Sequence, residues 1–170
     1  GHGHSVHNKY DAVGIAVTNI EEAEAVVKDL VDGGSTIIKI SLEPGGEAGA
    51  PWMSSHGHGD PPKTPWPILS LDIVKAIVAK AHLLNKRVMA HVGENTGVEL
   101  ALEGGVDEWA HIPCAEIRED LLHRAVAQNV TFVTTIDTLS ACTGVHTNMH
   151  KLAHIMAHSM DSKSKFIYGS

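Results

Sequence analysis

Three side chains that can bind metals or act as nucleophiles stand at the ends of short apolar runs in this sequence: Lys39, His91 and His111. Neutral imidazole is a common ligand of divalent transition metals. A lysine with a lowered pKa forms Schiff bases or transfers protons, and a lysine that has reacted with carbon dioxide bridges metals as a carbamate. The three residue types therefore predict a metal site or lysine chemistry.

Each of these residues alone has an ordinary explanation. An unpaired ammonium is costly to bury, so Lys39 needs a carboxylate partner, for which Glu43 or Glu47 is available, or a path for its side chain to water. A single histidine is more often a hydrogen-bonded structural residue than a ligand. Three such positions on three successive strands, with His91 and His111 twenty residues apart, favour a shared site.

The elements that must position these residues alternate regularly along the chain. Each predicted helix is followed by a short strand rich in β-branched residues, which indicates right-handed βαβ crossovers and a parallel α/β sheet or barrel. The carboxyl ends of parallel strands meet at one edge, where ligands bind in such folds. The predicted helices cover 20–32, 71–84, 98–102, 116–128 and 148–160, and the predicted strands cover 35–42, 86–92, 106–112, 130–136 and 166–168.

Composition excludes several functional classes. The 170 residues are 43% hydrophobic and 19% charged, as expected for one globular domain over 1–170. The formal net charge of -7 and the lack of a basic cluster argue against nucleic acid as a partner. There is no candidate membrane span or signal peptide, which favours a cytoplasmic protein, and Cys114 and Cys142 are expected as free thiols in or near the core.

Two further groups of histidines have spacings that metal sites use. The long loop 43–69 holds six of the seven prolines together with His56 and His58, and a loop pair of this kind usually faces solvent or substrate. His150, His154 and His158 follow one another at i, i+4 spacing, which places them on one helix face. No acid lies beside them in the sequence, so a solvated polar stripe is the favoured interpretation.

The segments around the three opening residues resemble a known family. Thr36-Ile-Ile-Lys-Ile-Ser, Asn85-Lys-Arg-Val-Met-Ala-His-Val and Ala101-Leu-Glu-Gly-Gly-Val-Asp-Glu-Trp-Ala-His-Ile are similar to strands four, five and six of the metal-dependent amidohydrolase superfamily. The likeness is greatest to its imidazolonepropionase-like and Xaa-Pro dipeptidase-like branch. It implies a TIM-type (β/α)8 barrel, of which this chain would form a partial barrel of about five βα units.

The resemblance also implies roles for individual residues. Lys39 corresponds to the lysine, often carboxylated, that bridges two metals, and His91 and His111 correspond to the histidines that hold the second metal. The implied cofactor is a divalent metal, zinc by preference, as one or two ions in a complete protein.

The chain departs from the family pattern at both ends. The family brings a His-x-His pair from strand one, but His2 and His4 lie too close to Lys39 for that, and resemble instead a glycine-histidine segment near the substrate. The catalytic aspartate of strand eight is expected directly after Ser170. A complete barrel takes about 250 residues. We therefore expect a piece that holds strands four to eight and no catalytic residue of its own.

Three functions compete at this stage. The first is hydrolysis of amide-type C–N bonds in a cyclic amide or a dipeptide by a metal-activated hydroxide, with this piece alone inactive. The second is a non-catalytic metal-binding or assembly module, completed by another chain or by a second copy in a homo-oligomer. The third is a Schiff-base lyase in which Lys39 is the nucleophile and no metal is needed.

Overall fold

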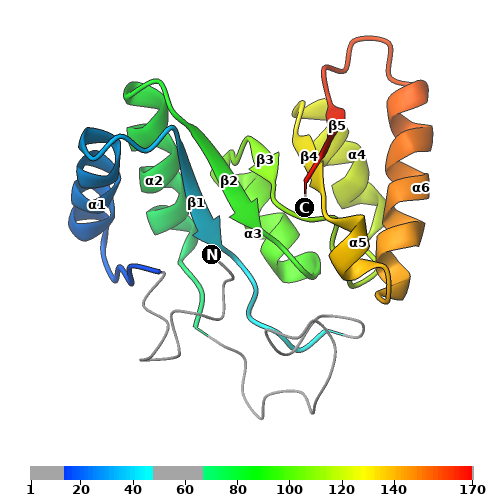
Figure 1. Ribbon diagram of the computed structural model, residues 1–170, viewed down its shortest axis with the longest axis horizontal. Coiled ribbons are helices and arrows are strands. Elements are labelled where there is room, and N and C mark those ends of the chain that lie inside the picture. The colour runs from blue at the N-terminus through cyan, green and yellow to red at the C-terminus, as the bar shows by residue number, and fades with distance from the viewer. Residues whose placement is uncertain (1–13, 48–66, 170) are drawn as a thin grey trace.

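The computed structural model describes residues 14–47 and 67–169, which form a five-stranded parallel sheet in the order β1-β2-β3-β4-β5 (Figure 1). The α/β class predicted from the sequence is confirmed. The strands are β1 Ile37–Ser41, β2 Arg87–His91, β3 Glu108–Trp109, β4 Thr131–Thr134 and β5 Lys165–Tyr168. The helices are α1 Ile20–Asp32, α2 Leu71–Leu83, α3 Asn95–Gly104, α4 Glu119–Ala127, α5 Ile136–Leu139 and α6 Thr143–Ala157.

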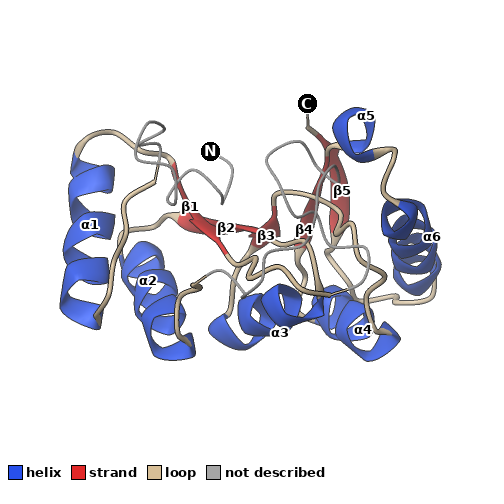
Figure 2. Cartoon of the chain, turned by 90° about the horizontal axis from the view of Figure 1, so that it is seen from below, coloured by secondary structure: helices blue, strands red, loops and turns tan. Residues whose placement is uncertain are grey.

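Helices cover only one face of this sheet. Figure 2 shows α1, α2, α3, α4 and α6 on its convex side, whereas the short α5 lies at the end of the sheet beside β5. This is the arrangement of part of a (β/α) barrel, in which each helix returns the chain over the outside of the sheet. The concave face corresponds to the inside of such a barrel. None of the helices in the described ranges is long and apolar enough to cross a membrane.

The alternation of side chains along β1 and β2 separates the two faces. Ile38 and Ile40 on β1, and Val88 and Ala90 on β2, are buried under the helices, at 9% exposure or less. Residues between them point to the opposite, concave face, because successive side chains of a strand alternate. Lys39 is therefore a concave-face residue, and so is His91 at the end of β2.

Three aromatic residues on β3, β4 and β5 pack together in the core. The rings of Trp109 and Phe132 lie 5.1 Å apart in an edge-to-face arrangement, and Phe166 of β5 lies 5.6 Å beyond Phe132. Trp109 and Phe132 have no exposed surface. Edge-to-face packing of this kind adds to the free energy gained from burial. The cluster fixes β3, β4 and β5 to the helical layer.

Several predicted helix ends are confirmed. Asn19 Oδ1 accepts a hydrogen bond from the Glu22 amide at 2.9 Å, and Ser70 Oγ accepts one from the Ile73 amide at 3.4 Å. These contacts satisfy backbone donors that the first turn of a helix leaves unpaired. At the other end of α3, Gly105 has φ of +78°, a left-handed conformation that favours glycine.

The predicted strand over 106–112 is shorter than expected. β3 comprises only Glu108 and Trp109, although the amide of Ala110 still donates to Ala90 O at 2.8 Å. The chain then leaves the ladder, and the next bond to the β2 segment is from the Ala115 amide to Gly93 O at 2.9 Å. His111 consequently lies in the loop after β3 and not in a strand.

The segment after β4 also differs from the prediction. The strand ends at Thr134, and the next residues form the short helix α5. α6 begins at Thr143, five residues before the predicted start at Asn148. Residues 143–147 include glycine, valine and threonine, which are weak helix formers, so the sequence pattern there is weak and tertiary packing decides the helix start.

The contact between α3 and the end of β1 leaves no room for a side chain at Gly97. A Cβ there would lie 1.8 Å from the carbonyl oxygen of Leu42, which is backbone and cannot rotate away. We expect Gly97→Ala to lower the free energy of unfolding by about 1–3 kcal/mol, as overpacking does. Urea denaturation measures this loss. Gly33→Ala is the control, because its Cβ would meet no atom closer than 3.2 Å, and an equal loss in both variants would contradict the prediction.

Candidate metal and catalytic site on the concave face

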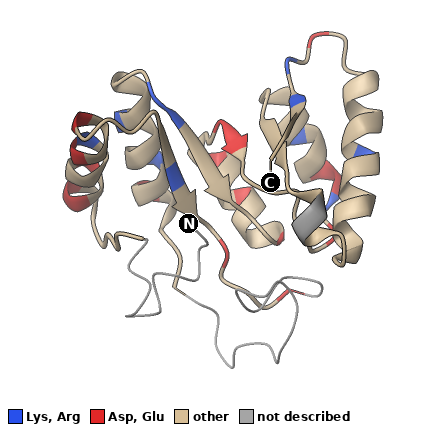
Figure 3. Ribbon diagram, in the orientation of Figure 1, with Lys and Arg blue, Asp and Glu red and all other residues tan. Residues whose placement is uncertain are grey.

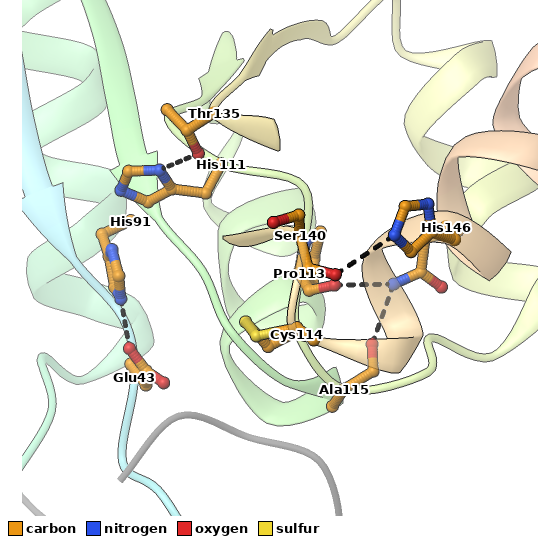
Figure 4. The surroundings of a disulfide bond; sticks show 11 residues. Glu43, His91, His111, Pro113, Cys114, Ala115, Thr135, Ser140 and His146 are labelled. Atoms are coloured by element: carbon orange, nitrogen blue, oxygen red, sulfur yellow. Dashed lines mark hydrogen bonds and ion pairs between the residues drawn. A yellow bond between two sulfur atoms is a disulfide. The ribbon is translucent and has the colours of Figure 1, made fainter. Parts of the chain in front are cut away.

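His91 is buried where β2 ends. It lies opposite Ser41 of β1 in the parallel register and is 2% exposed. Its Nε2 is paired with Oε2 of Glu43, which is also buried and lies two residues beyond β1 (Figure 4). A buried imidazole with a buried carboxylate is a satisfied pair, since each neutralises or hydrogen-bonds the other.

His111 lies beside His91, as the sequence predicted. The two ring centroids are 4.9 Å apart in an edge-to-face arrangement. Nδ1 of His111 is in hydrogen-bond contact with Oγ1 of Thr135 at 2.7 Å, at the end of β4 (Figure 4). The contact fixes the orientation of the ring relative to β4. Residues from the ends of β2, β3 and β4 thus converge at one edge of the sheet.

Lys39 occupies the middle of β1 and not its end, which corrects the position expected from the sequence. It is opposite Met89, one step along the concave face from the Ser41–His91 pair. The side chain is exposed on this face, yet surrounding atoms desolvate the ammonium enough to lower its pKa. The structure brings the two histidines together and places the lysine on the adjacent strand, on the same face.

The two carboxylates considered as partners of Lys39 are engaged elsewhere. Glu43 pairs with His91. Glu47 binds the N-terminus of α3: its carboxylate accepts from the backbone amides of Asn95 and Thr96 at 2.8 and 2.9 Å and from both side chains at 2.8 Å. These contacts lower the pKa of Glu47, against the effect of burial. A carboxylate at a helix N-terminus is favourable because it meets unpaired N–H groups.

Glu94 is a third acid close to this region, three residues after His91. It has no exposed surface, and its Oε2 accepts from the Glu47 amide at 2.9 Å. Burial raises the pKa of Glu94, with a further contribution from the nearby charges of Glu47 and Glu43. The charged carboxylate is therefore less favourable at this position than in water.

Towards the amino ends of the strands, the concave face carries a polar layer. Arg87 pairs with Glu108 across the β2–β3 boundary at 2.8 Å, and it donates to Oγ1 of Thr131 on β4 at 3.2 Å. Figure 3 shows basic residues on β1 and β2 and acidic residues on β3. The Glu108 side chain is 8% exposed, so the arginine compensates a nearly buried charge.

The two histidines fit a divalent transition metal as part of a ligand set. Imidazole suits zinc, and both rings come from neighbouring strand ends. An ion at His91 Nε2 would replace the Glu43 contact or share it. Across residues 14–47 and 67–169, no group of three or more His, Cys, Asp and Glu is arranged as a metal site. Candidates for a further ligand are Glu43, which already contacts His91 Nε2, and Lys39 after carboxylation.

Some residues singled out from the sequence cannot be placed. His2 and His4, expected near the substrate, lie outside the described residues, as do His56 and His58. Asp137, which follows β4 at the same edge of the sheet, lies in α5, and its side chain is outside the described part.

The expectation of two free thiols is wrong, because Cys114 and Cys142 form a disulfide with a Cα–Cα distance of 5.0 Å. The two cysteines are 28 residues apart in the sequence and belong to no recognisable pattern, so only the fold pairs them. Disulfides persist mainly in oxidising environments. Such a bond is unusual in the cytoplasm, the location that the sequence favoured.

The disulfide joins two segments that flank the histidine pair. Cys114 lies three residues after His111, and Cys142 caps α6. Asn148, fully buried on α6, holds the same loop: its Nδ2 donates to Pro113 O and Ala115 O, and its Oδ1 accepts from the Ile117 amide, at 2.8 to 2.9 Å. The loop after β3 is therefore fastened to α6 by one covalent bond and three hydrogen bonds.

Sequence reasoning missed two residues of the site. Thr135 follows β4 directly, so the strand-end rule that selected His91 could have selected it. Glu94 has no such signal, because its burial depends on Glu47, which is 47 residues away in the sequence.

No protein-family model and no curated protein matches the chain. Solved structures do match. A prolidase complexed with N-methylphosphonate-L-proline has a TM-score of 0.63 at 20% identity, over 94% of this chain and 40% of the prolidase. A Xaa-Pro dipeptidase with methionine in its active site has a TM-score of 0.60 at 18% identity, over 98% and 44% of the two chains. Phenylurea hydrolase B has a TM-score of 0.64 at 16% identity, over 90% and 35%.

The fold is that of part of a (β/α) barrel, as in these solved hydrolases. The match covers nearly the whole of this chain, whereas the chain spans about two fifths of the length of the prolidase. The predicted partial TIM-type barrel is thereby confirmed. At these identities the likeness concerns the fold.

The Cys114–Cys142 disulfide leads to a prediction about free thiols. Protein purified without reductant and then denatured should contain no titratable thiol, because the chain has only two cysteines and both are paired. Cys114→Ser/Cys142→Ser should lower the free energy of unfolding by about 2–4 kcal/mol, because the crosslink no longer restricts the unfolded chain. The single variant Cys114→Ser should lose as much as the double variant. Two free thiols in the unreduced protein would contradict the pairing.

Glu94 leads to a prediction about pH. The folded protein binds the Glu94 proton more tightly than the unfolded chain, since burial raises the pKa above the ordinary 4.5. Its contribution to stability is therefore present at low pH and is lost as the pH rises from the unfolded towards the folded pKa. As the pH rises through this range, we expect the free energy of unfolding of Glu94→Gln to increase relative to that of the wild type. Chemical denaturation from pH 3 to 8 measures the difference, with Glu24→Gln on the exposed side of α1 as control, and a difference independent of pH would exclude the shift.

Proposed function

We propose that this protein is part of a metal-dependent hydrolase that cleaves amide-type C–N bonds. The observation that carries the proposal is the approach of His91 and His111, with ring centroids 4.9 Å apart at the carboxyl edge of an amidohydrolase-type sheet. Active sites of barrel enzymes lie at this edge. The solved structures with this fold include a prolidase, a Xaa-Pro dipeptidase and a phenylurea hydrolase, which supports hydrolysis as the reaction class.

In this proposal His91, His111 and a carboxylated Lys39 hold a divalent metal, with zinc as the preferred ion. When bound, the metal supplies a nucleophilic hydroxide at neutral pH and polarises the scissile carbonyl. Each protein residue has a separate task. Thr135 orients the His111 ring through Nδ1, as partners of metal-binding histidines do. Glu43 holds His91 at the end of β2 and keeps a negative charge beside it.

The proposed substrates are cyclic amides or dipeptides. The support is the resemblance of the segments around Lys39, His91 and His111 to the Xaa-Pro dipeptidase-like branch, together with the fold. The resemblance assigns proton transfer to an aspartate of strand eight and further metal ligands to a His-x-His pair of strand one, and it matches neither to a residue of this sequence.

An assembly module is the second candidate. It is favoured by the one-sided helical layer, because none of the helices in residues 14–47 and 67–169 covers the concave face (Figure 2). In that case the histidine pair binds metal without turnover, and a partner chain or a second copy completes the barrel. Hydrolytic activity after addition of the missing strands would separate the two candidates.

Metal content tests the ligand assignment directly. We expect the purified chain to bind zinc, and His91→Ala or His111→Ala to weaken binding by at least about 100-fold, because each removes a donor from a small ligand set. Isothermal titration and elemental analysis measure this. His123→Ala is the matched control, since His123 is an exposed histidine on α4.

The outcomes separate the competing functions. If neither variant changes zinc affinity, His91 and His111 are not metal ligands. A Lys39 adduct trapped by borohydride with a carbonyl substrate, in protein without metal, would instead support the Schiff-base lyase.

A further inference from the structure

The exposed side of α6 carries histidines at regular spacing. His146, His150, His154 and His158 follow one another at i, i+4 intervals, and all four are exposed. α6 lies at the edge of the molecule in Figure 1 and packs against α4. The spacing alone indicates a solvated polar stripe. Two contacts of His154 and His158 indicate a metal site in addition.

The first detail is the contact between two rings. The centroids of His154 and His158 are 4.4 Å apart, with their planes inclined by 33°. Two imidazoles bound to one ion, each at about 2.0–2.1 Å through nitrogen, have ring centroids a few ångströms apart. This pair is therefore already within the reach of one ion.

The second detail is the hydrogen bond of His158. Its Nδ1 lies 2.8 Å from the carbonyl oxygen of His154. A carbonyl oxygen can only accept, so Nδ1 carries the proton and donates. In the neutral ring the lone pair is then on Nε2. Metal-binding histidines are oriented in this way, with one ring nitrogen donating to a backbone carbonyl while the other binds the ion.

We propose that His154 and His158 form a surface site for a divalent transition-metal ion of the zinc, nickel or copper class, with Nε2 of His158 as one ligand. Histidines at i and i+4 project from the same helix face and can chelate one ion. Water completes the coordination, because both side chains are exposed. This site is independent of the concave-face histidines and does not rest on the proposed hydrolase function.

His158 also has a structural role. It is the C-cap residue of α6, and its Nδ1–H donates to the carbonyl oxygen of His154 in the last turn of the helix. The same bond serves both roles, because it leaves Nε2 available. If His158 only capped the helix, its substitution would not change the zinc concentration at which the His154 imidazole responds.

The test follows each imidazole separately by two-dimensional NMR of the full chain during titration with Zn²⁺. We expect the signals of His154 and His158 to change together, at a lower zinc concentration than those of His146 and His150. In His158→Asn, the zinc concentration that half-saturates the His154 signal should rise by about tenfold or more. In His146→Asn, the matched control on the same helix, it should change by less than about twofold.

Two results would overturn the proposal. One is a common midpoint for all four α6 histidines, and the other is an unchanged His154 midpoint in His158→Asn. The reciprocal variant His154→Asn, read at His158, guards against a loss of folding in the first variant. Far-UV circular dichroism shows whether α6 remains helical in each.

Discussion

The helices bury only one face of the sheet, and the rest of the structure depends on this constraint. In the described part of the chain the strands are parallel, and α1, α2, α3, α4 and α6 pack on the convex face (Figure 2). Alternate residues of β1 and β2 are therefore forced into the core. The residues between them face the concave side, where charge is tolerated. Lys39, Arg87 and His91 are there because their neighbours Ile38, Val88 and Ala90 must be under the helices. The position of the candidate site is thus a consequence of core formation.

The site combines histidines with acids that arrive from loops. Glu43 meets His91, and Glu47 connects the segment after β1 to the N-terminus of α3. The close approach of Gly97 to Leu42 lets the same helix pack against the chain just beyond β1. The ends of β1 and β2 are consequently held as one unit. This rigidity matters for a metal site, since ligand geometry must be held closely.

A second set of contacts holds the His111 side of the site. Asn148 and the Cys114–Cys142 disulfide attach the loop after β3 to α6, while Thr135 contacts the His111 ring. None of these pairings follows from local sequence. The short β3 and the early start of α6 were mispredicted for the same reason. β3 ends where the chain turns into the loop held by Asn148, and the same contacts stabilise a helix start whose intrinsic propensity is weak.

The sequence by itself determined the alternation of helices and strands and the parallel α/β class, because these depend on local periodicity. It also singled out His91 and His111 through their residue chemistry and their place after apolar runs. Tertiary structure decided which side chains meet. It moved Lys39 to the middle of β1, paired the two cysteines, and buried both Glu43 and Glu94. Those outcomes depend on contacts between residues far apart in the chain, and no local pattern encodes the loop conformations that create them.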